Sequence, residues 1–571
     1  MKKKIMPVLI VLLLIVVVAG GLAISSYIKK YTPSTERADL NEYFNADSDD
    51  MVSIVFNHAR SEQRAKQING HLYLDYGFVH DYLNPRFYWD ENANILFYTT
   101  AGDVISADAE SSSYLVTKSS VDFGSTIVKA TAGSAWVNID FAQQYSDFTY
   151  TYYDSPSRIV LYNKWGTVNV VSASKDTVIR EKGGIKSPIL CDLASDVPVT
   201  VLAEEENWTK VMTDDGIIGY VRNKFLNEKT TDTLSHEFTE ETFTHIKKDF
   251  EICMAWHQVF STDANSDIAS ILSSSKGINV ISPTWFYLND NEGNLSNLAS
   301  LDYVNYCHQQ GVEVWALFSN LENTEVDTTY VLTHSSTRQN LVNQIVSMAI
   351  QYNLDGVNLD FEAMNGPAVG ESYIQFVREL SLKCANNGIV LSVDNYVPTD
   401  YTAFYNRAEQ ANFADYIVIM GYDEHYSGSD AGSVASLSWV KEGVENTLKE
   451  VPSDQIILGM PFYTRVWCLT PRSDDSDTEM IYDTTSEAYG MNAAARRVAS
   501  NEAEKVWLED CGQFYAEYEK NGSIYTIWLE DSSSIDERLR LLDSYSLAGA
   551  SFWKLGLESS DIWDTVIKYI N

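Results

Sequence analysis

The C-terminal part of the chain, from Phe250 onward, alternates short apolar runs with longer amphipathic stretches. Stretches such as "TRQNLVNQIVSMAIQYN" and "ESYIQFVRELSLKCANN" have apolar residues at helical spacing and predict helices. The apolar runs read as eight strands: "ICMAWHQV", "INVISPTWFYL", "VEVWALFS", "LDGVNLDFE", "IVLSVDNYV", "DYIVIMGYD", "QIILGMPFY" and "GASFWKLGL". Nearly continuous apolar strands that alternate with helices are typical of a parallel sheet, and eight such units over about 320 residues predict a closed (β/α)8 barrel, an α/β fold.

The middle of the chain shows the two-residue alternation of β-structure. Runs such as "HLYLDYGFV" and "SRIVLYN" predict a β-rich, stalk-like domain over residues 51–165. A second small β-rich module follows at 166–226, where "WTKVMTDDGIIGYV" predicts two strands joined at Asp215-Gly216, a typical hairpin turn.

The end of this second module resembles a bacterial SH3-like domain in the spacing of Trp208, Gly219, Tyr220 and Val221. The resemblance implies that residues 166–226 bind a cell-wall peptide. The alternative is that these residues only build a small barrel, and the sequence leaves both possibilities open.

The N-terminus carries a basic cluster, Lys2 to Lys4, before an apolar run at residues 5–24. This run has close to the roughly 20 residues that a helix needs to cross a bilayer, and it is longer than the roughly 7–15 apolar residues of a signal peptide. We therefore expect an uncleaved signal anchor in the cell membrane, with the chain after Lys30 extracellular. Cleavage near Gly21-Leu22-Ala23, which would release a secreted protein, is the alternative.

Two polar, charged segments separate these regions and predict linkers at 31–50 and 227–247. The predicted layout is a transmembrane helix at 1–30, a linker at 31–50, the stalk-like domain at 51–165, the SH3-like domain at 166–226, a linker at 227–247 and the barrel at 248–571.

The chain is strongly acidic, with 41 Lys and Arg against 79 Asp and Glu and a formal charge of −38. Such a charge would be repelled by nucleic acid phosphates, so a nucleic acid partner is not expected. The six cysteines have no CxxC spacing and no His-rich motif accompanies the acidic residues. We therefore expect no metal and no other cofactor.

The predicted fourth barrel strand, "LDGVNLDFE", carries polar residues on one face. Because strand side chains alternate, Asn358, Asp360 and Glu362 point one way, and Leu359 and Phe361 the other. Burying two carboxylates on one face costs free energy, so their presence indicates a function. They lie at the carboxyl end of a barrel strand, where the active sites of such barrels are found.

Three motifs resemble glycoside hydrolase family 18, the chitinase and endo-N-acetylglucosaminidase family. "DGVNLDFE" resembles its Asp-Gly-x-x-x-Asp-x-Glu signature on strand four, "MGYD" its Met-x-Tyr-Asp on strand six, and "SFWKLG" its Trp at the end of strand eight. Within the family, "SPTWF", "YDEHYSGS" and "GMPFYTRVW" look most like the spore-cortex branch of peptidoglycan N-acetylglucosaminidases.

The resemblance implies a substrate-assisted mechanism, in which the 2-acetamido group of the sugar attacks its own anomeric carbon. Glu362 would protonate the leaving oxygen and Asp360 would orient the acetamide and stabilise the positive intermediate. Tyr422 would hydrogen-bond the acetamide carbonyl, Asp423 would help to hold the sugar, and Trp553 would form the floor beneath it.

One position departs from the family, because many active members have Asp where this chain has Asn358. We assign Asn358 to substrate binding and expect Asp360 to carry the negative charge of the free enzyme alone. For the strand-end aromatic residues Trp285, Tyr287 and Trp467, subsite lining and core packing remain equal alternatives.

The expected function is therefore that of a membrane-anchored extracellular hydrolase. It would cleave β-1,4 bonds next to N-acetylglucosamine, in peptidoglycan, with retention of configuration. The alternatives are a chitinase that acts on chitin oligomers and a non-catalytic glycan-binding protein. The second alternative is disfavoured because chitinase-like lectins usually lack the acid that Glu362 supplies here.

Overall fold

The computed structural model describes residues 2–46, 48, 50–131, 134–364, 366–472 and 482–570; parts of the segments predicted above, including linker positions 47 and 49, lie outside the described residues. The chain divides into two compact units. The first unit consists of Met1–Trp89, Ala107–Tyr114 and Ser120–Glu240, and the second of Asp90–Ser106, Leu115–Ser119 and Glu241–Asn571.

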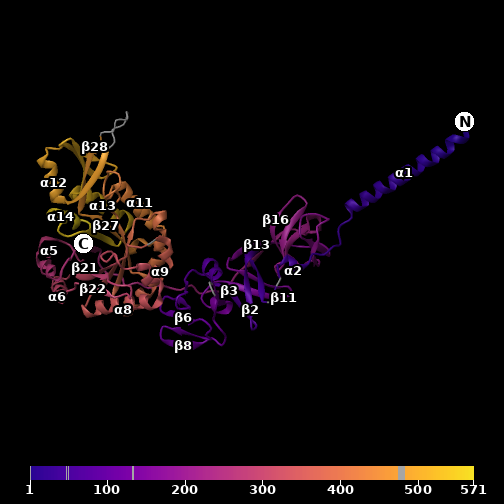
Figure 1. The fold of residues 1–571 in the computed structure, drawn as a ribbon, viewed down its shortest axis with the longest axis horizontal. Helices are drawn as coiled ribbons and strands as arrows, with labels where there is room; N and C mark the ends of the chain where they lie inside the picture. Colours follow the sequence, from indigo (N-terminus) through magenta and orange to yellow (C-terminus); the bar gives the residue numbers. More distant parts are fainter. Residues whose placement is uncertain are drawn as a thin grey trace. The chain divides into compact units, whose positions relative to one another are not determined.

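The second unit contains the predicted parallel barrel (Figure 1). The strands are β20 Ile252–His257, β21 Val280–Leu288, β23 Glu313–Ser319, β24 Gly356–Asp360, β25 Val390–Tyr396, β26 Tyr416–Met420, β27 Ile456–Pro461 and β33 Gly549–Trp553. Each strand pairs with the next in parallel, and β20 pairs with both β21 and β33, which closes the sheet. All eight strand-like runs of the sequence contain one barrel strand, so the predicted fold class is confirmed.

The barrel strands bury apolar side chains on both faces. Val357 and Leu359 of β24 belong to the large core between strands and helices. Trp256, Trp315 and Leu317 belong to a smaller core inside the barrel. This burial on both faces explains why the runs are almost continuously apolar. The helices of this unit are α5 Ile268–Ser274, α6 Leu301–Gln309, α7 Thr328–Thr333, α8 Ser335–Gln351, α9 Gly370–Ala385, α10 Arg407–Phe413, α11 Leu437–Thr447, α13 Ser532–Tyr545 and α14 Ile562–Val566.

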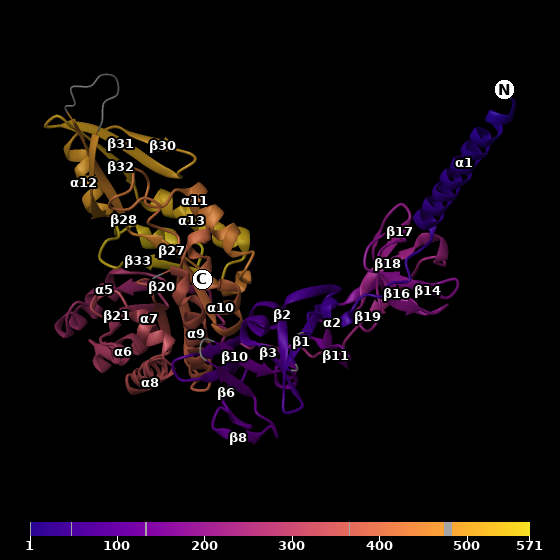
Figure 2. The same ribbon diagram turned by 45° about the vertical axis from the view of Figure 1, so that its right-hand side comes forward.

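An antiparallel five-stranded sheet is inserted between β27 and β33 (Figure 2). Its strands are β28 Tyr463–Pro471, β29 Tyr482–Gly490, β30 Lys505–Leu508, β31 Gln513–Lys520 and β32 Ser523–Leu529, and the helix α12 Met491–Ser500 packs on it. The sequence analysis did not identify this sheet. Its signal is the Asn521-Gly522 turn between β31 and β32, where both residues have positive φ, as hairpin turns require.

A short antiparallel strand, β22 Leu295–Asn297, extends the barrel at β21. Part of the predicted stalk-like domain also belongs to the barrel unit. Asp90 accepts a hydrogen bond from the backbone N–H of Ser335 at 2.7 Å, and Gln375 of α9 donates one to Thr99 at 3.1 Å. The boundary predicted at residue 165 therefore does not separate all of residues 51–165 from the barrel.

The first unit is built mainly from β-sheets. One seven-stranded sheet has the order β11-β12-β1-β2-β3-β10-β9 and another the order β15-β14-β18-β17-β16-β13-β19. The first of these consists of β1 Met51–Phe56, β2 Ala59–Ile68, β3 His71–Asp75, β9 Val128–Thr131, β10 Ser134–Asn138, β11 Thr149–Asp154 and β12 Ser157–Tyr162. The second consists of β13 Gly166–Ser172, β14 Thr177–Arg180, β15 Ile189–Leu193, β16 Pro198–Glu204, β17 Trp208–Met212, β18 Ile218–Arg222 and β19 Thr230–Leu234.

Further short elements complete the β-rich part of the chain. A five-stranded sheet contains β4 Phe87–Asp90, β5 Ile95–Thr99, β6 Val104–Asp108, β7 Ser113–Val116 and β8 Ser119–Asp122. The short helices are α2 Leu40–Tyr43, α3 Tyr76–Phe78 and α4 Ile139–Gln143. The predicted hairpin is present, because β17 and β18 pair on either side of Gly216, whose φ is +82°.

Both segments predicted as linkers contain ordered elements. Within 31–50, Phe44 is 2% exposed and packs in one core with Val55 and Val171. Within 227–247, β19 pairs with β13 along the edge of the SH3-like sheet. Amino-acid composition does not reveal either element. A single buried aromatic residue is enough to dock a polar segment, and an edge strand needs few apolar residues.

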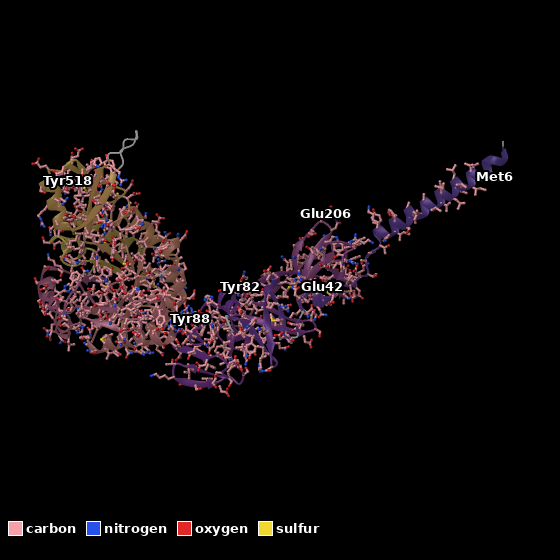
Figure 3. All side chains as sticks on the ribbon, in the orientation of Figure 1. Met6, Glu42, Tyr82, Tyr88, Glu206 and Tyr518 are labelled. Atoms are coloured by element: carbon pink, nitrogen blue, oxygen red, sulfur yellow. The ribbon has the colours of Figure 1, made fainter. Side chains whose placement is uncertain are left out.

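The N-terminal helix α1, Lys2–Tyr31, contains the predicted apolar run. Its segment Met6–Tyr31 is long and apolar enough to cross a membrane, and none of the most apolar part is buried against other residues. Figure 3 shows the side chains of this helix, including Met6, projecting outward. A signal sequence also has this length and composition, so both predicted alternatives remain open.

Candidate active site

The motif on the fourth barrel strand, β24, begins with residues that fix the strand in the sheet and ends with polar residues that face the cleft. At the start of β24, Asp355 accepts hydrogen bonds from the backbone N–H of Val314 and from His308, both at 2.8 Å. Gly356 is required by close packing, because a Cβ there would lie 2.6 Å from the Trp315 ring. These residues fix β24 in the sheet, so that Asp360 lies at its carboxyl end.

The backbone after β24 is held by side chains from other elements. Asn320, which follows β23, accepts hydrogen bonds from the backbone N–H groups of Glu362 and Ala363 at 2.9 and 3.1 Å. Tyr405 donates to the carbonyl oxygen of Phe361 at 3.0 Å. The position of Glu362 therefore depends on two buried side chains that the sequence analysis did not select.

A cleft of about 600 Å³ opens at the carboxyl ends of the barrel strands. Side chains from many strand ends and the loops after them line it: Trp256, Gln258, Val259, Phe260, Thr284, Tyr287, Leu298, Leu317, Leu321, Glu322, Asp360, Glu362, Asp394, Tyr396, Met420, Tyr422, Asp423 and Trp553. A concave site with aromatic walls and a few converging polar groups is suited to a small organic ligand such as a sugar.

Five of the six predicted site residues line this cleft: Asp360, Glu362, Tyr422, Asp423 and Trp553. Trp256 joins two of them, because its ring lies edge-on to those of Trp553 and Tyr422 at centroid distances of 5.8 and 6.5 Å. Among the three aromatic residues left open, Tyr287 lines the cleft. Trp285 and Trp467 are core residues, at most 1% exposed.

Asn358 does not line the cleft, although the sequence predicts a role for it in substrate binding. Its side chain is fully buried. Its Oδ1 accepts from Trp256 at 2.8 Å and Ser282 at 3.0 Å, and its Nδ2 donates to Ser392 at 3.1 Å and Asp394 at 2.6 Å. An amide has two donor and two acceptor positions, and all four are used within the protein. No hydrogen-bonding group of Asn358 remains for a sugar.

The carboxylates of the cleft have perturbed acidity. Burial raises the pKa of Asp360 well above its ordinary value, and the neighbouring charges of Glu362 and Asp394 add to this rise. Burial also raises the pKa of Glu362, and a hydrogen bond with the Tyr396 hydroxyl opposes that rise. Low polarity and mutual repulsion both favour neutral carboxyl groups, so the cluster retains protons at higher pH than separate carboxylates would.

Asp423 sits at the rim of the cleft in a left-handed backbone conformation, with φ of +62°. Tyr463 of β28 donates a hydrogen bond to its carboxylate at 2.5 Å. Asp tolerates this conformation better than most residues, and such backbone positions are often found at functional sites. The inserted sheet thus supplies the partner that orients Asp423.

Among the polar residues of the cleft that the sequence analysis did not select, three are acids or phenols: Glu322, Asp394 and Tyr396. The signal for two of them was present, because Asp394 and Tyr396 occupy alternate positions at the end of "IVLSVDNY", as Asn358, Asp360 and Glu362 do in the preceding strand. Glu322 lies in the loop after β23, where no periodic pattern marks it. Among the described residues, no group of three or more His, Cys, Asp or Glu is arranged to hold a metal ion.

A closed parallel barrel with carboxylates at the carboxyl end of its fourth strand fits a barrel glycosidase. The sequence profile of glycosyl hydrolases family 18 matches residues 216–558, and the chain belongs to this family. The sequence profile of the bacterial SH3 domain matches residues 175–227. Both predicted resemblances are confirmed.

Relatives of the chain include bacterial glycosylases. It is 24% identical over 323 residues to the uncharacterized glycosylase YvbX of Bacillus subtilis, covering 54% of this chain and 90% of that protein. It is 25% identical over 279 residues to the cortical fragment-lytic enzyme of B. subtilis, covering 47% of this chain and 62% of that enzyme. The crystal structure of the Bacillus cereus spore cortex-lytic enzyme SleL has the same barrel fold, with a TM-score of 0.50 and 19% identity over 59% of this chain and 79% of that one.

Proposed function

We propose that the chain hydrolyses β-1,4 bonds next to N-acetylglucosamine in peptidoglycan. The observation that carries this proposal is the carboxylate pair of buried Asp360 and half-buried Glu362 in a cleft with aromatic walls. The kinship with a cortical fragment-lytic enzyme supports a cell-wall substrate. Chitin offers the same acetamido sugar and remains the second candidate, distinguished by the assay below.

In the proposed mechanism, Glu362 is the general acid. Its raised pKa favours the protonated form, which is the form that can donate a proton to the leaving glycosidic oxygen. The acetamido oxygen of the substrate attacks the anomeric carbon as the bond to the leaving group breaks. Asp360 orients the acetamido N–H and stabilises the positive ring that forms. Glu362, now a carboxylate, takes a proton from the water that opens this ring, and the enzyme returns to its starting state.

Two aromatic residues and one acid complete the proposed subsite. The Tyr422 hydroxyl donates a hydrogen bond to the acetamido oxygen, and Trp553 packs beneath the sugar ring. Asp423, held by Tyr463, hydrogen-bonds the sugar from the rim. The mechanism thus requires an N-acetylated sugar on the non-reducing side of the cleaved bond.

Glu362→Gln tests the proposed function directly. With purified peptidoglycan, the parent chain should release fragments with new reducing ends, detected by mass spectrometry of the products, and colloidal chitin assayed in parallel identifies the preferred glycan. The variant should lose about 10²–10⁴-fold in rate, because an amide cannot donate the required proton in the same way. Glu519→Gln, an exposed change in β31, is the matched control and should keep full activity. Hydrolysis by Glu362→Gln within a few-fold of the parent would contradict the assignment.

The anomeric form of the first product tests the substrate-assisted route. Because the acetamido group and then water attack the same carbon from opposite faces, the product should retain the configuration of the substrate. Proton NMR during the first minutes of reaction, before mutarotation, reports this directly. A product of inverted configuration would exclude an intramolecular intermediate.

We also propose that α1 anchors the chain in the cell membrane with the barrel outside. The length and apolarity of Met6–Tyr31, preceded by lysines in the sequence, support this topology. Protease added to intact cells should remove the barrel, whereas the N-terminal end becomes accessible only after permeabilisation. A barrel that resists the protease in intact cells would contradict the orientation, and free protein that lacks the apolar run would indicate cleavage.

We further propose that the SH3-like module takes part in binding wall peptides. A polar cleft of about 860 Å³ lies in the first unit, lined by Arg37, Arg60 and Arg64, by several acids, and by Glu181 and Pro188 of the module. Charges of both signs suit the zwitterionic stem peptides of a cell wall.

Comparison of two wall preparations tests this binding. The full chain should bind intact walls more tightly than walls whose stem peptides were removed by an amidase, since the second preparation offers only the glycan. Co-sedimentation at low and high salt measures the difference, which should shrink with salt because surface charges are screened. Equal binding to both preparations would mean that the module does not recognise peptides.

A further inference from the structure

The strand beside β24 carries a second buried carboxylate of the cleft. β25 pairs with β24 in parallel, with Asn358 opposite Ser392 and Leu359 opposite Val393. The next pair along this register is Asp360 and Asp394, on neighbouring strands that lie about 4.8 Å apart. Asp394 is 3% exposed and lines the cleft.

Asn358 holds Asp394 in place. The indole of Trp256 can only donate, so its 2.8 Å hydrogen bond fixes which end of the Asn358 amide is the oxygen. The amide nitrogen must then face β25, where it donates to Oδ1 of Asp394 at 2.6 Å. The orientation of Asp394 is therefore set by a chain of two hydrogen bonds that begins at Trp256.

The groups around Asp394 are acids and phenols. Asp394 interacts electrostatically with the carboxyl groups of Asp360 and Glu362 at the end of β24. It interacts in the same way with the hydroxyls of Tyr422, after β26, and Tyr373, on α9. In the described part of the chain, no Lys or Arg appears among the charges that act on Asp360 or Asp394. One carboxylate oxygen of Asp360 is buried without a hydrogen-bond partner. Two neighbouring buried carboxylates without a cation cannot both be ionised at low cost, and sharing a proton relieves the repulsion.

We propose that Asp394 is the proton-sharing partner of Asp360, and that it supplies from β25 the carboxyl group that many family members have at the position of Asn358. This inference rests on the proposed function. In the free enzyme the pair holds one proton. When the acetamido group arrives, the proton resides on Asp394, and Asp360 faces the substrate as the anion. The pair neither gains nor loses a proton in this step. Asp394 is thus a positioning residue that sets the charge of Asp360.

Exchanging the acid and the amide between the two strands tests this proposal. Asp394→Asn should lower kcat about tenfold or more with a smaller change in KM, since Asp360 loses its proton partner but the cleft keeps its shape. The double variant Asn358→Asp/Asp394→Asn places the carboxyl group on β24 again and should recover most of the lost rate. The assay uses the full-length chain in detergent, with a fluorogenic glycoside of N,N′-diacetylchitobiose as the probe, over a range of pH.

Two controls make the result specific. Asp302→Asn, an exposed change at the start of α6, has the same chemistry and should leave the pH profile unchanged. Asn358→Asp alone sets a carboxyl group against Asp394 across the present 2.6 Å contact, so the two must share an additional proton, and its pH optimum should move upward. A pH profile of Asp394→Asn identical to that of the parent, or a double variant as slow as Asp394→Asn, would overturn the proposal.

A second readout does not depend on activity. Burial and the nearby charge of Glu362 raise the pKa of Asp394 in the folded protein. The stability that its protonated form provides is complete below the unfolded pKa of about 3.9 and is lost as pH rises through the folded pKa. The melting temperature of the barrel should therefore fall less with rising pH in Asp394→Asn than in the parent. Identical pH dependence of melting would overturn the proton-sharing pair. A parent that melts as expected but cleaves no glycan would refute the proposed function alone.

Discussion

The constraint on which this active site depends is the burial of several carboxyl groups at the end of two neighbouring strands. Asp360 and Asp394 are almost inaccessible to water, and Glu362 follows in the next loop. Ionised carboxylates in such surroundings are strongly disfavoured unless a cation or several donors compensate them. Around this cluster the compensation comes from protons and neutral donors, including the Asn358 amide and the Tyr396 hydroxyl. That arrangement is what a general acid near neutral pH requires.

Such a cluster is tolerated because the stability of the barrel comes from elsewhere. The outward face of β24 packs Val357 and Leu359 into the large core, so the inward face can carry polar groups without loss of the fold. The support extends to the loop, where Asn320 and Tyr405 hold the backbone of Phe361 to Ala363. Activity should accordingly be sensitive to residues that never contact the substrate, because a small displacement of Glu362 would misplace its proton.

Much of this organisation could be predicted from the sequence. The eight barrel strands were visible because strands buried on both faces are apolar throughout, and five site residues were visible because they lie in motifs at strand ends. The docking of Phe44 and the pairing of β19 were not visible, since each depends on a partner far away in the sequence. Asp394 escaped for the same reason. The alternation of Asp394 with Tyr396 marks a polar face of this strand, but only the register of β25 against β24 places Asp394 beside Asp360.

The location of the third carboxyl group has a physical consequence. Asn358 is enclosed and makes four hydrogen bonds to the protein, whereas Asp394 lines the cleft. An acid at position 358 could exchange its proton only through its neighbours, but an acid at 394 borders the space that water and substrate enter. A neutral amide at 358 still satisfies Trp256 and Ser282, which need only an acceptor. In the proposed arrangement, a carboxyl group on β25 in place of one at position 358 preserves the hydrogen bonds inside the barrel and puts the titrating group at the cleft.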